Sequence, residues 1–93
     1  MSAEYVRKYR AKLKREVMNA YGGKCIRCEV IDLRVLTLDH PNGDGKDDRL
    51  GTSGGWYTYL KLRREGYPKR VQVVCFNCHR IIEHERRGWN DYI

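Results

Sequence analysis

The chain has 93 residues, with 19 Lys or Arg against 12 Asp or Glu and a formal net charge of +7. So short a chain buries only about 60–65% of its unfolded surface, so its core alone gives marginal stability. No apolar run approaches the roughly 20 residues of a membrane span, and the charged N-terminus lacks a signal-like apolar segment. We expect one domain over residues 1–93 in the cytoplasm of a bacterial or archaeal host, with no membrane partner; the excess of positive charge favours nucleic acid.

The first predicted element is an amphipathic helix from Ser2 to about Tyr21. Apolar residues recur at every fourth position and form one stripe: Tyr5, Tyr9, Leu13, Val17 and Tyr21, with Val6 and Met18 beside them. The rest of the surface is cationic, and Gly22-Gly23 ends the helix. Residues 1–22 are therefore a basic N-terminal helix, whose cationic face is either solvated or in contact with DNA, and residues 23–88 are the core.

Strands and a short helix follow in the core. The β-branched and apolar residues 30–39 predict a strand that ends at Asp39-His40, and the turn formers of residues 41–45 must then leave it abruptly. Residues 46–55 predict a polar, glycine-rich loop. Residues 56–65 predict a short inserted helix that Gly66 and Pro68 close.

The C-terminal part predicts a second strand and a last helix. The strand covers residues 71–74, and the helix covers residues 79–87, with Ile81 and Ile82 buried and Gly88 at its end. These elements define an α+β fold. We expect the aromatic residues Trp56, Tyr57 and Trp89 to pack in the core, with stacking on unpaired bases as the alternative.

Two Cys-x-x-Cys pairs are the strongest signal in the sequence. Cys25 and Cys28 form the first pair, and Cys75 and Cys78 form the second. Each pair places two thiolates on one tight turn, and two such turns complete a tetrahedral zinc site. Such pairs bind metal more often than they form disulfides in a reducing compartment, and no thioredoxin-like βαβ pattern surrounds them. We predict one structural zinc ion that joins the two ends of the core and is required for folding.

The residues around the cysteines resemble a known enzyme family. "LDH" at 38–40, followed by a glycine-rich turn, and "VVCFNCH" at 73–79 are similar to the ββα-metal (His-Me finger) nucleases of the HNH superfamily. The likeness runs from about Tyr21 to Glu85. Within the superfamily, the chain resembles in particular the zinc-containing HNH endonucleases of bacteriophages and prophages, which are relatives of endonuclease VII. It implies a small zinc-stapled ββα-metal domain with a basic N-terminal helix and an inserted short helix. It also implies metal-dependent hydrolysis of DNA and is consistent with a phage-encoded protein.

The resemblance gives three side chains a role in hydrolysis. His40 would be the general base toward the attacking water. Asp39 and His79 would bind the catalytic divalent ion, Mg²⁺ or Mn²⁺, which neutralises charge gathering on the phosphate and the leaving oxygen. Glu83 lies one helical turn after His79 and could reach the same ion directly or through water.

The chain departs from the family pattern at the middle Asn, because Arg70 stands at about that place. Another residue must then steady the loop that carries the base. Asn42 is one candidate and Asn77 is another, although its place inside the second cysteine pair favours a bond to thiolate sulfur or a helix cap. Two other functions stay open: a non-catalytic zinc-stabilised module that binds nucleic acid, and a nuclease specific for branched DNA.

Cationic side chains are spread over several elements, which favours contact with the DNA backbone and low sequence specificity. The predicted DNA contacts are Arg49, Arg64, Lys69, Arg70 and Arg80. By the resemblance, Arg80 would hold a phosphate beside His79. A monomer of this size should carry one active site, so cutting both strands would need a homodimer or two successive nicks.

Overall fold

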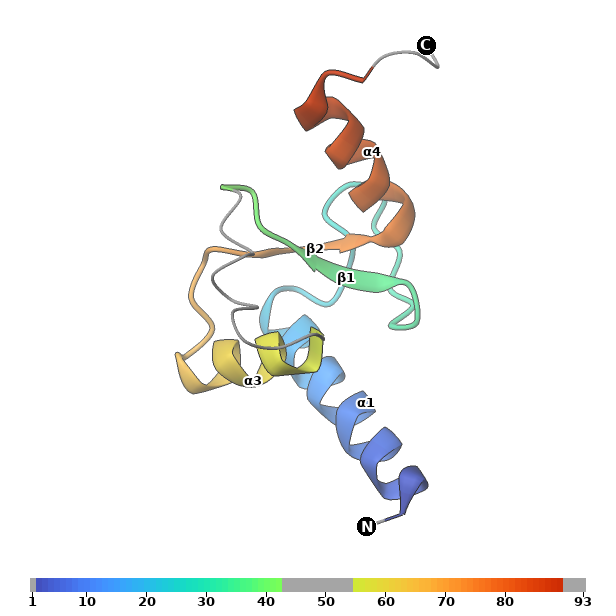
Figure 1. The fold of residues 1–93 in the computed structure, drawn as a ribbon, viewed down its shortest axis with the longest axis vertical. Coiled ribbons are helices and arrows are strands. Elements are labelled where there is room, and N and C mark those ends of the chain that lie inside the picture. Colours follow the sequence, from blue (N-terminus) through green and yellow to red (C-terminus); the bar gives the residue numbers. More distant parts are fainter. Residues whose placement is uncertain (1, 43–54, 90–93) are drawn as a thin grey trace.

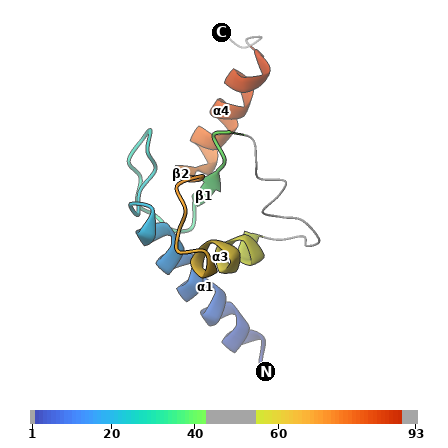
Figure 2. The ribbon, with the colours of Figure 1, turned by 90° about the vertical axis from the view of Figure 1, so that its left-hand side faces the viewer.

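The computed structural model describes residues 2–42 and 55–89 of the chain. These residues form α1 (Ala3–Ala20), β1 (Leu36–Asp39), α3 (Gly55–Arg64), β2 (Gln72–Cys75) and α4 (Phe76–Arg87). The two strands pair antiparallel, with Leu36 opposite Cys75 and Asp39 opposite Gln72. Figure 1 shows this small sheet midway along the molecule, with α4 on one side and α1 with α3 on the other, and the view in Figure 2 agrees. A mixed α+β arrangement is thus confirmed.

The basic helix forms as predicted and ends at the glycine pair. The Ser2 hydroxyl accepts a hydrogen bond from the Tyr5 amide at 3.2 Å and caps the N-terminus of α1. At the other end, the Gly23 amide donates to the Met18 carbonyl at 2.8 Å, and Gly23 has a φ of 73°. This left-handed conformation is the usual reason for glycine after a helix.

Only the C-terminal half of the predicted apolar stripe is buried. Leu13 and Val17 pack with Leu62 of α3 and Val71 in a small core cluster. Tyr5 and Tyr9, at the N-terminal end of the stripe, are 57% and 40% exposed. Figure 1 shows that the first turns of α1 extend beyond α3, the helix that packs on the rest of α1.

The first strand is much shorter than the predicted residues 30–39. Local polar contacts hold the segment before Leu36 in a turn. The Val35 amide donates to the Asp32 carbonyl at 3.1 Å, and the Arg34 guanidinium contacts the Asp32 carboxylate at 2.7 Å. An Asp side chain that bonds its own backbone neighbourhood competes with extended structure. The strand begins only where this turn ends.

The second helix in the described chain, α3, matches the prediction, whereas α4 starts earlier than predicted. It begins at Phe76, because the Cys75 sulfur accepts a hydrogen bond from the Cys78 amide and caps the helix. Gly88 ends it with a φ of 70°, as expected. Ile82 is buried, but Ile81 is 52% exposed, so its predicted burial is wrong.

The tryptophans do not pack in the core as predicted. Trp56 is 38% exposed and lies under the guanidinium of Arg10, 5.0 Å from the ring centre. Trp89 is 43% exposed and makes edge contact with His84 at 5.2 Å. Tyr57 is half-buried. Cation–π and edge contacts thus hold aromatic rings that the small core has no room to bury.

The larger core cluster lies between the sheet, the end of α1 and α4. Its buried members are Met18, Cys25, Leu36, Val73, Val74, Cys75, Cys78 and Ile82. Three of the eight are cysteines, so the thiol groups are part of the core itself. None of the helices in the described ranges is long and apolar enough to cross a membrane.

Candidate metal and catalytic site

The four cysteines converge on one point. The sulfur atoms of Cys25, Cys28, Cys75 and Cys78 all lie within 4.8 Å of one another, and none forms a disulfide. The Cys28 and Cys75 sulfurs are 3.6 Å apart. Four thiolates around zinc at about 2.3 Å would be about 3.8 Å from each other. The set could therefore hold one metal ion with small adjustments of the side chains.

Backbone hydrogen bonds fix the two cysteine turns against the sheet. The Ile26 amide of the first turn donates to the Val73 carbonyl at 3.0 Å, and the Phe76 amide donates to the Val35 carbonyl at 3.0 Å. Glu29, which closes the first turn, has a φ of 65°. This strained left-handed residue shows that the turn is held by its surroundings.

The thiols influence one another's ionisation. Burial raises the pKa of Cys25, but hydrogen bonds from the backbone at Cys28, Arg27 and Cys75 outweigh it and lower that pKa to about 6. The pKa of Cys78 is raised to about 12, chiefly by its hydrogen bond with the Cys75 sulfur and by burial. Closely packed sulfurs thus share protons when no cation is near. A bound metal takes thiolates, so its binding would release the remaining protons.

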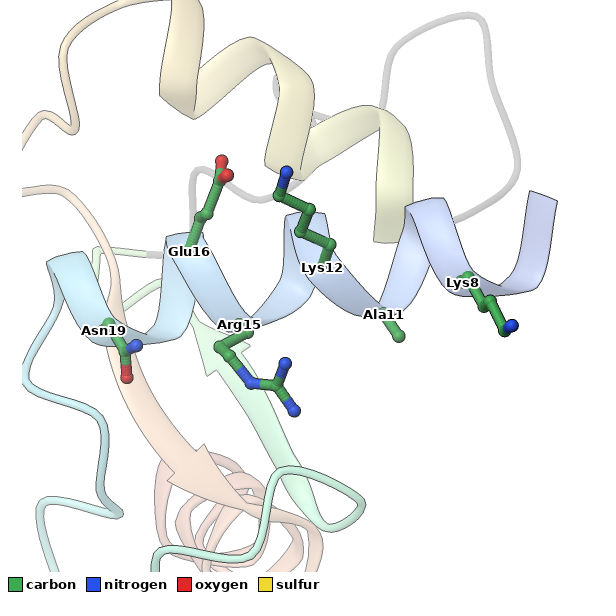
Figure 3. Close-up of a pocket in the computed structure, with 6 residues that line it drawn as sticks. All are labelled: Lys8, Ala11, Lys12, Arg15, Glu16 and Asn19. Atoms are coloured by element: carbon green, nitrogen blue, oxygen red, sulfur yellow. The ribbon is translucent and has the colours of Figure 1, made fainter. Parts of the chain in front are cut away.

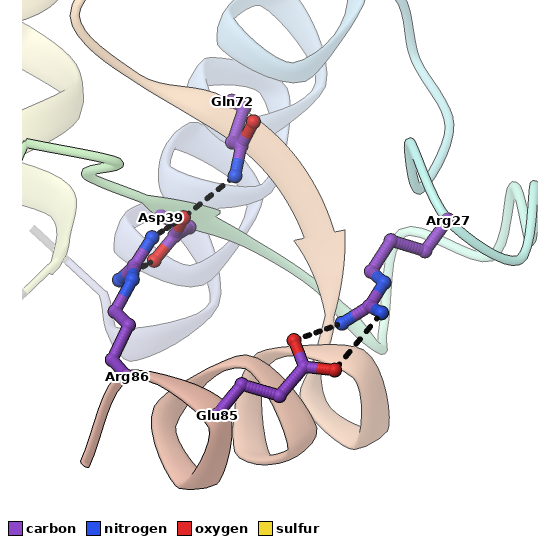
Figure 4. A network of polar contacts seen from close by, with 5 residues as sticks. All are labelled: Arg27, Asp39, Gln72, Glu85 and Arg86. Atoms are coloured by element: carbon purple, nitrogen blue, oxygen red, sulfur yellow. Dashed lines mark hydrogen bonds and ion pairs between the residues drawn. The ribbon is translucent and has the colours of Figure 1, made fainter. Parts of the chain in front are cut away.

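Asp39 is the most enclosed charged side chain of the site, at 1% exposure. Its carboxylate accepts two hydrogen bonds from Arg86, at 2.8 Å on Oδ1 and 2.7 Å on Oδ2, and one from Gln72 Nε2 at 2.7 Å on Oδ2. Figure 4 shows both partners reaching the carboxylate, Gln72 from β2 and Arg86 from α4. Burial raises the pKa of Asp39, but the bonds from Arg86 and Gln72 outweigh it and lower the pKa below its ordinary value. The group is a carboxylate at neutral pH.

His79 approaches the same carboxylate from α4. Its Nε2 atom is 3.5 Å from Asp39 Oδ1. Two ligand atoms at that separation subtend about 110° at an ion about 2.1 Å from each, which is close to a tetrahedral angle. An octahedral ion such as Mg²⁺ needs them about 3.0 Å apart. The pair predicted to bind the catalytic ion is therefore brought together. Its present separation suits a tetrahedral ion, and a modest closing movement would suit it to an octahedral one.

The fold explains how these side chains meet. Asp39 ends β1 directly opposite Gln72, and the hydrogen-bonded sheet places both at one edge. His79 and Arg86 are seven positions apart on α4, about 20° short of two full turns, so they share one helix face. The cysteine turn at the start of α4 orients that face toward the sheet.

Two residues of the site were missed in the sequence. Gln72 is a polar residue within a strand. The sequence does not reveal the strand register that places it opposite Asp39. Arg86 is one of several basic residues near the C-terminus, and its charge alone does not single it out. Its spacing from His79 was the available signal, since the same helix-face argument had been applied to Glu83.

Other predicted site residues form ion pairs of their own. Glu83 accepts from Arg80, at 3.3 Å, along the exposed side of α4. Arg70 pairs with Glu65 at 2.8 Å. Of the remaining candidates, His40 is half-buried directly after β1, and Asn42, Arg64, Lys69 and Asn77 are exposed. Arg49, with residues 46–54, is not among the described residues. Cys75, not Asn77, caps the helix.

The middle and C-terminal turns of α1 offer a separate cationic surface. Figure 3 shows a shallow hollow along this helix, with the basic side chains of Lys8, Lys12 and Arg15 around it. Glu16, also on its rim, contacts Arg63 of α3 at 3.3 Å. The hollow belongs to one helix and lacks walls that could enclose a small molecule. It suits an extended polyanion better than a compact ligand.

Comparison with protein-family models, with curated proteins and with solved structures gives no match for this chain.

Proposed function

We propose that the chain is a metal-dependent endonuclease of the ββα-metal (HNH) type that hydrolyses phosphodiester bonds in DNA. The observation that carries the proposal is the 3.5 Å separation between the buried Asp39 carboxylate and the His79 imidazole. A carboxylate and an imidazole form a mixed oxygen and nitrogen site that suits Mn²⁺ and other first-row divalent ions. One ligand comes from the end of β1 and the other from α4, the helix that follows β2, which is the order that the sequence resemblance implies.

The cysteine cluster serves a different metal. Sulfur-only sites suit zinc, and a closed set of four leaves no position for a substrate. We therefore assign a structural zinc ion to Cys25, Cys28, Cys75 and Cys78, which lie within 4.8 Å of one another. Zinc would fix the start of α4, and His79 follows its last ligand directly. The structural metal would thereby set the position of a ligand to the catalytic one.

The chain's own residues divide the work of hydrolysis. When bound at Asp39 and His79, a divalent ion would supply positive charge for the phosphate and the leaving oxygen. Gln72 donates to Oδ2 of Asp39 and so leaves Oδ1 directed toward His79. His40 is the next residue after Asp39, and in extended chain its side chain departs to the other side of the backbone. We assign to it the removal of a proton from the attacking water.

Contact with DNA would come from cations on several elements. Arg80 on α4 lies one residue from His79, and the basic residues of α1 face outward along the hollow of Figure 3. Such contacts go to phosphates and carry no base information. The proposed enzyme therefore has low sequence specificity and binds more weakly as salt rises.

One observation favours a second candidate, a non-catalytic module that binds nucleic acid. Arg86 and Gln72 already fill most of the hydrogen-bonding capacity of the Asp39 carboxylate without any metal. A purely structural ion pair would look the same. The two candidates differ in whether the protein cleaves DNA. Substitution of His40, the proposed general base, therefore distinguishes them.

The test is relaxation of a supercoiled plasmid by zinc-loaded protein with Mg²⁺ or Mn²⁺. His40→Ala should lower the nicking rate at least about 100-fold, the usual contribution of a general base. His84→Ala is the matched control, because His84 packs on Trp89 at 5.2 Å and has no assigned role in hydrolysis. Equal nicking by wild type and His40→Ala would contradict the proposal. No nicking by any variant, across both metals and several salt concentrations, would favour the non-catalytic module.

The same wild-type protein can be tested on linear duplex, single strand and four-way junction. Similar rates on plasmid and linear duplex are the expected result. Cleavage confined to the four-way junction would show that the enzyme is specific for branched DNA and not a general nuclease.

A further inference from the structure

Arg86 binds the same Asp39 carboxylate that the proposed divalent ion needs as a ligand. Its two terminal nitrogens lie 2.8 Å from Oδ1 and 2.7 Å from Oδ2, and Gln72 adds a bond of 2.7 Å to Oδ2. A carboxylate offers about four lone-pair positions. Three of these positions are taken, and the fourth, on Oδ1, faces His79 at 3.5 Å.

The guanidinium and a divalent ion conflict at this oxygen. An ion bound to Oδ1 would stand about 2.1 Å from it, while the Arg86 Nη1 atom is 2.8 Å from the same oxygen. Two cations would then lie side by side next to a carboxylate that is only 1% exposed. Screening by water and salt is weak at such a site, so their repulsion is strong. The guanidinium and the ion therefore compete electrostatically for the single negative charge of Asp39.

Arg86 is the partner that can move. Its side chain is 40% exposed, whereas Asp39 is enclosed. Arg86 lies next to the end of α4, and its long apolar stem allows the charged head to turn outward. A displaced guanidinium keeps the planar fork that binds phosphate oxygens as well as carboxylate oxygens.

We propose that Arg86 and the divalent ion compete for Asp39, and that displaced Arg86 binds a phosphate of the DNA. This inference rests on the proposed function for the identity of the ion. In the absence of the ion, Arg86 neutralises a buried carboxylate and keeps β1 joined to α4. In its presence, the same side chain becomes a positioning residue for the substrate. Binding of the ion and of DNA are then coupled through one guanidinium.

The first test is the affinity of zinc-loaded protein for Mn²⁺ without DNA, measured by calorimetry. Arg86→Gln should bind Mn²⁺ at least 10-fold more tightly than wild type, because the competing charge is gone. Arg87→Gln is the control: it removes one positive charge from the next residue, whose guanidinium lies 4.7 Å from the Trp89 ring, and should behave as wild type. Arg86→Lys retains a charge but cannot bridge both oxygens, so its affinity should lie between the two. It also serves if Arg86→Gln fails to fold.

The outcomes separate this inference from the proposed function. If wild type binds Mn²⁺ and the folded Arg86 variants bind it no more tightly, the competition is wrong and the catalytic site stands. If neither wild type nor the Arg86 variants bind Mn²⁺ at millimolar concentration, the proposed metal site itself fails, and the inference fails with it. A purely structural Arg86 would give equal or weaker binding on substitution, which is the opposite direction.

The second test is binding of a fluorescent duplex to zinc-loaded protein with no other divalent ion. Asp39→Asn should release Arg86 and raise DNA affinity about 10-fold, and the double variant with Arg86→Gln should lose that gain. Glu85→Gln controls for the loss of one negative charge, since Glu85 lies on α4 and its partner Arg27 has no assigned contact with DNA. A gain in Asp39→Asn that survives in the double variant would overturn the phosphate role of Arg86.

Discussion

At the scale of single residues, the Asp39 carboxylate has partners of unequal freedom. Asp39 is 1% exposed and cannot reach water, whereas the Arg86 head is 40% exposed and can. Removing one member of such a pair therefore has different consequences on the two sides. An unpaired guanidinium turns into solvent, but an unpaired buried carboxylate keeps its full desolvation cost.

This asymmetry predicts an order of stabilities in the absence of divalent ions. Arg86→Gln should lower the free energy of unfolding by about 1–3 kcal/mol, less than for a fully buried pair because the arginine is partly solvated. Asp39→Asn should cost less, because it leaves no buried charge. Urea denaturation of the zinc-loaded proteins measures both. A larger loss for Asp39→Asn than for Arg86→Gln would show that leaving the buried carboxylate unpaired is not the more costly change.

At the scale of elements, two kinds of contact tie the first cysteine turn to α4. One is the cysteine cluster, in which sulfurs from both turns lie within 4.8 Å. The other is the Arg27–Glu85 pair, drawn in Figure 4, with two hydrogen bonds of 3.1 and 3.3 Å. Both side chains of that pair are largely exposed, so solvent screens their attraction and the pair should contribute little.

A comparison of two variants tests whether the cysteine cluster or the Arg27–Glu85 pair holds the first cysteine turn to α4. Cys28→Ser should lose zinc, as measured by metal analysis, and should lose most of its helical circular dichroism. Glu85→Gln should retain one zinc per chain and unfold at almost the wild-type temperature. If Glu85→Gln unfolds the domain while Cys28→Ser remains native, the ion pair and not the metal holds α4.

The same elements show how far sequence reasoning reaches. The cysteine spacing predicted a cluster that the folded chain forms, and the glycines predicted where α1 and α4 end. Patterns of this kind are local and depend on backbone chemistry. The predicted strand of residues 30–39 failed because Asp32 bonds to its neighbours and holds a turn, which apolar content does not reveal.

The candidate site was predictable only in part, for a related reason. Asp39, His40 and His79 were found by their likeness to a motif, and the approach of Asp39 to His79 agrees with it. Gln72 and Arg86 were missed because their roles arise from strand register and helix face. Tyr5 and Tyr9 had the right spacing for burial, but the described chain places little over that part of α1.

At the scale of the whole molecule, the proposed catalytic site depends on the cysteine cluster for its position. The cysteine cluster is part of the main core, and α4 begins at one of its members. His79 lies one position beyond the last cysteine and contacts the carboxylate at the end of β1. Loss of the proposed structural zinc should therefore disorder the proposed catalytic site, whereas loss of the proposed catalytic ion should leave the fold intact, with Arg86 on Asp39.

The measurement that tests this account most directly is selective removal of metal from the wild-type protein. Brief chelation should leave one zinc per chain by metal analysis, native far-UV circular dichroism and no plasmid nicking, and added Mn²⁺ should restore nicking. Longer chelation that removes the zinc should unfold the domain and abolish nicking even after Mn²⁺ is added. Nicking that persists with one zinc per chain and no other divalent ion, or a native fold without zinc, would contradict the account.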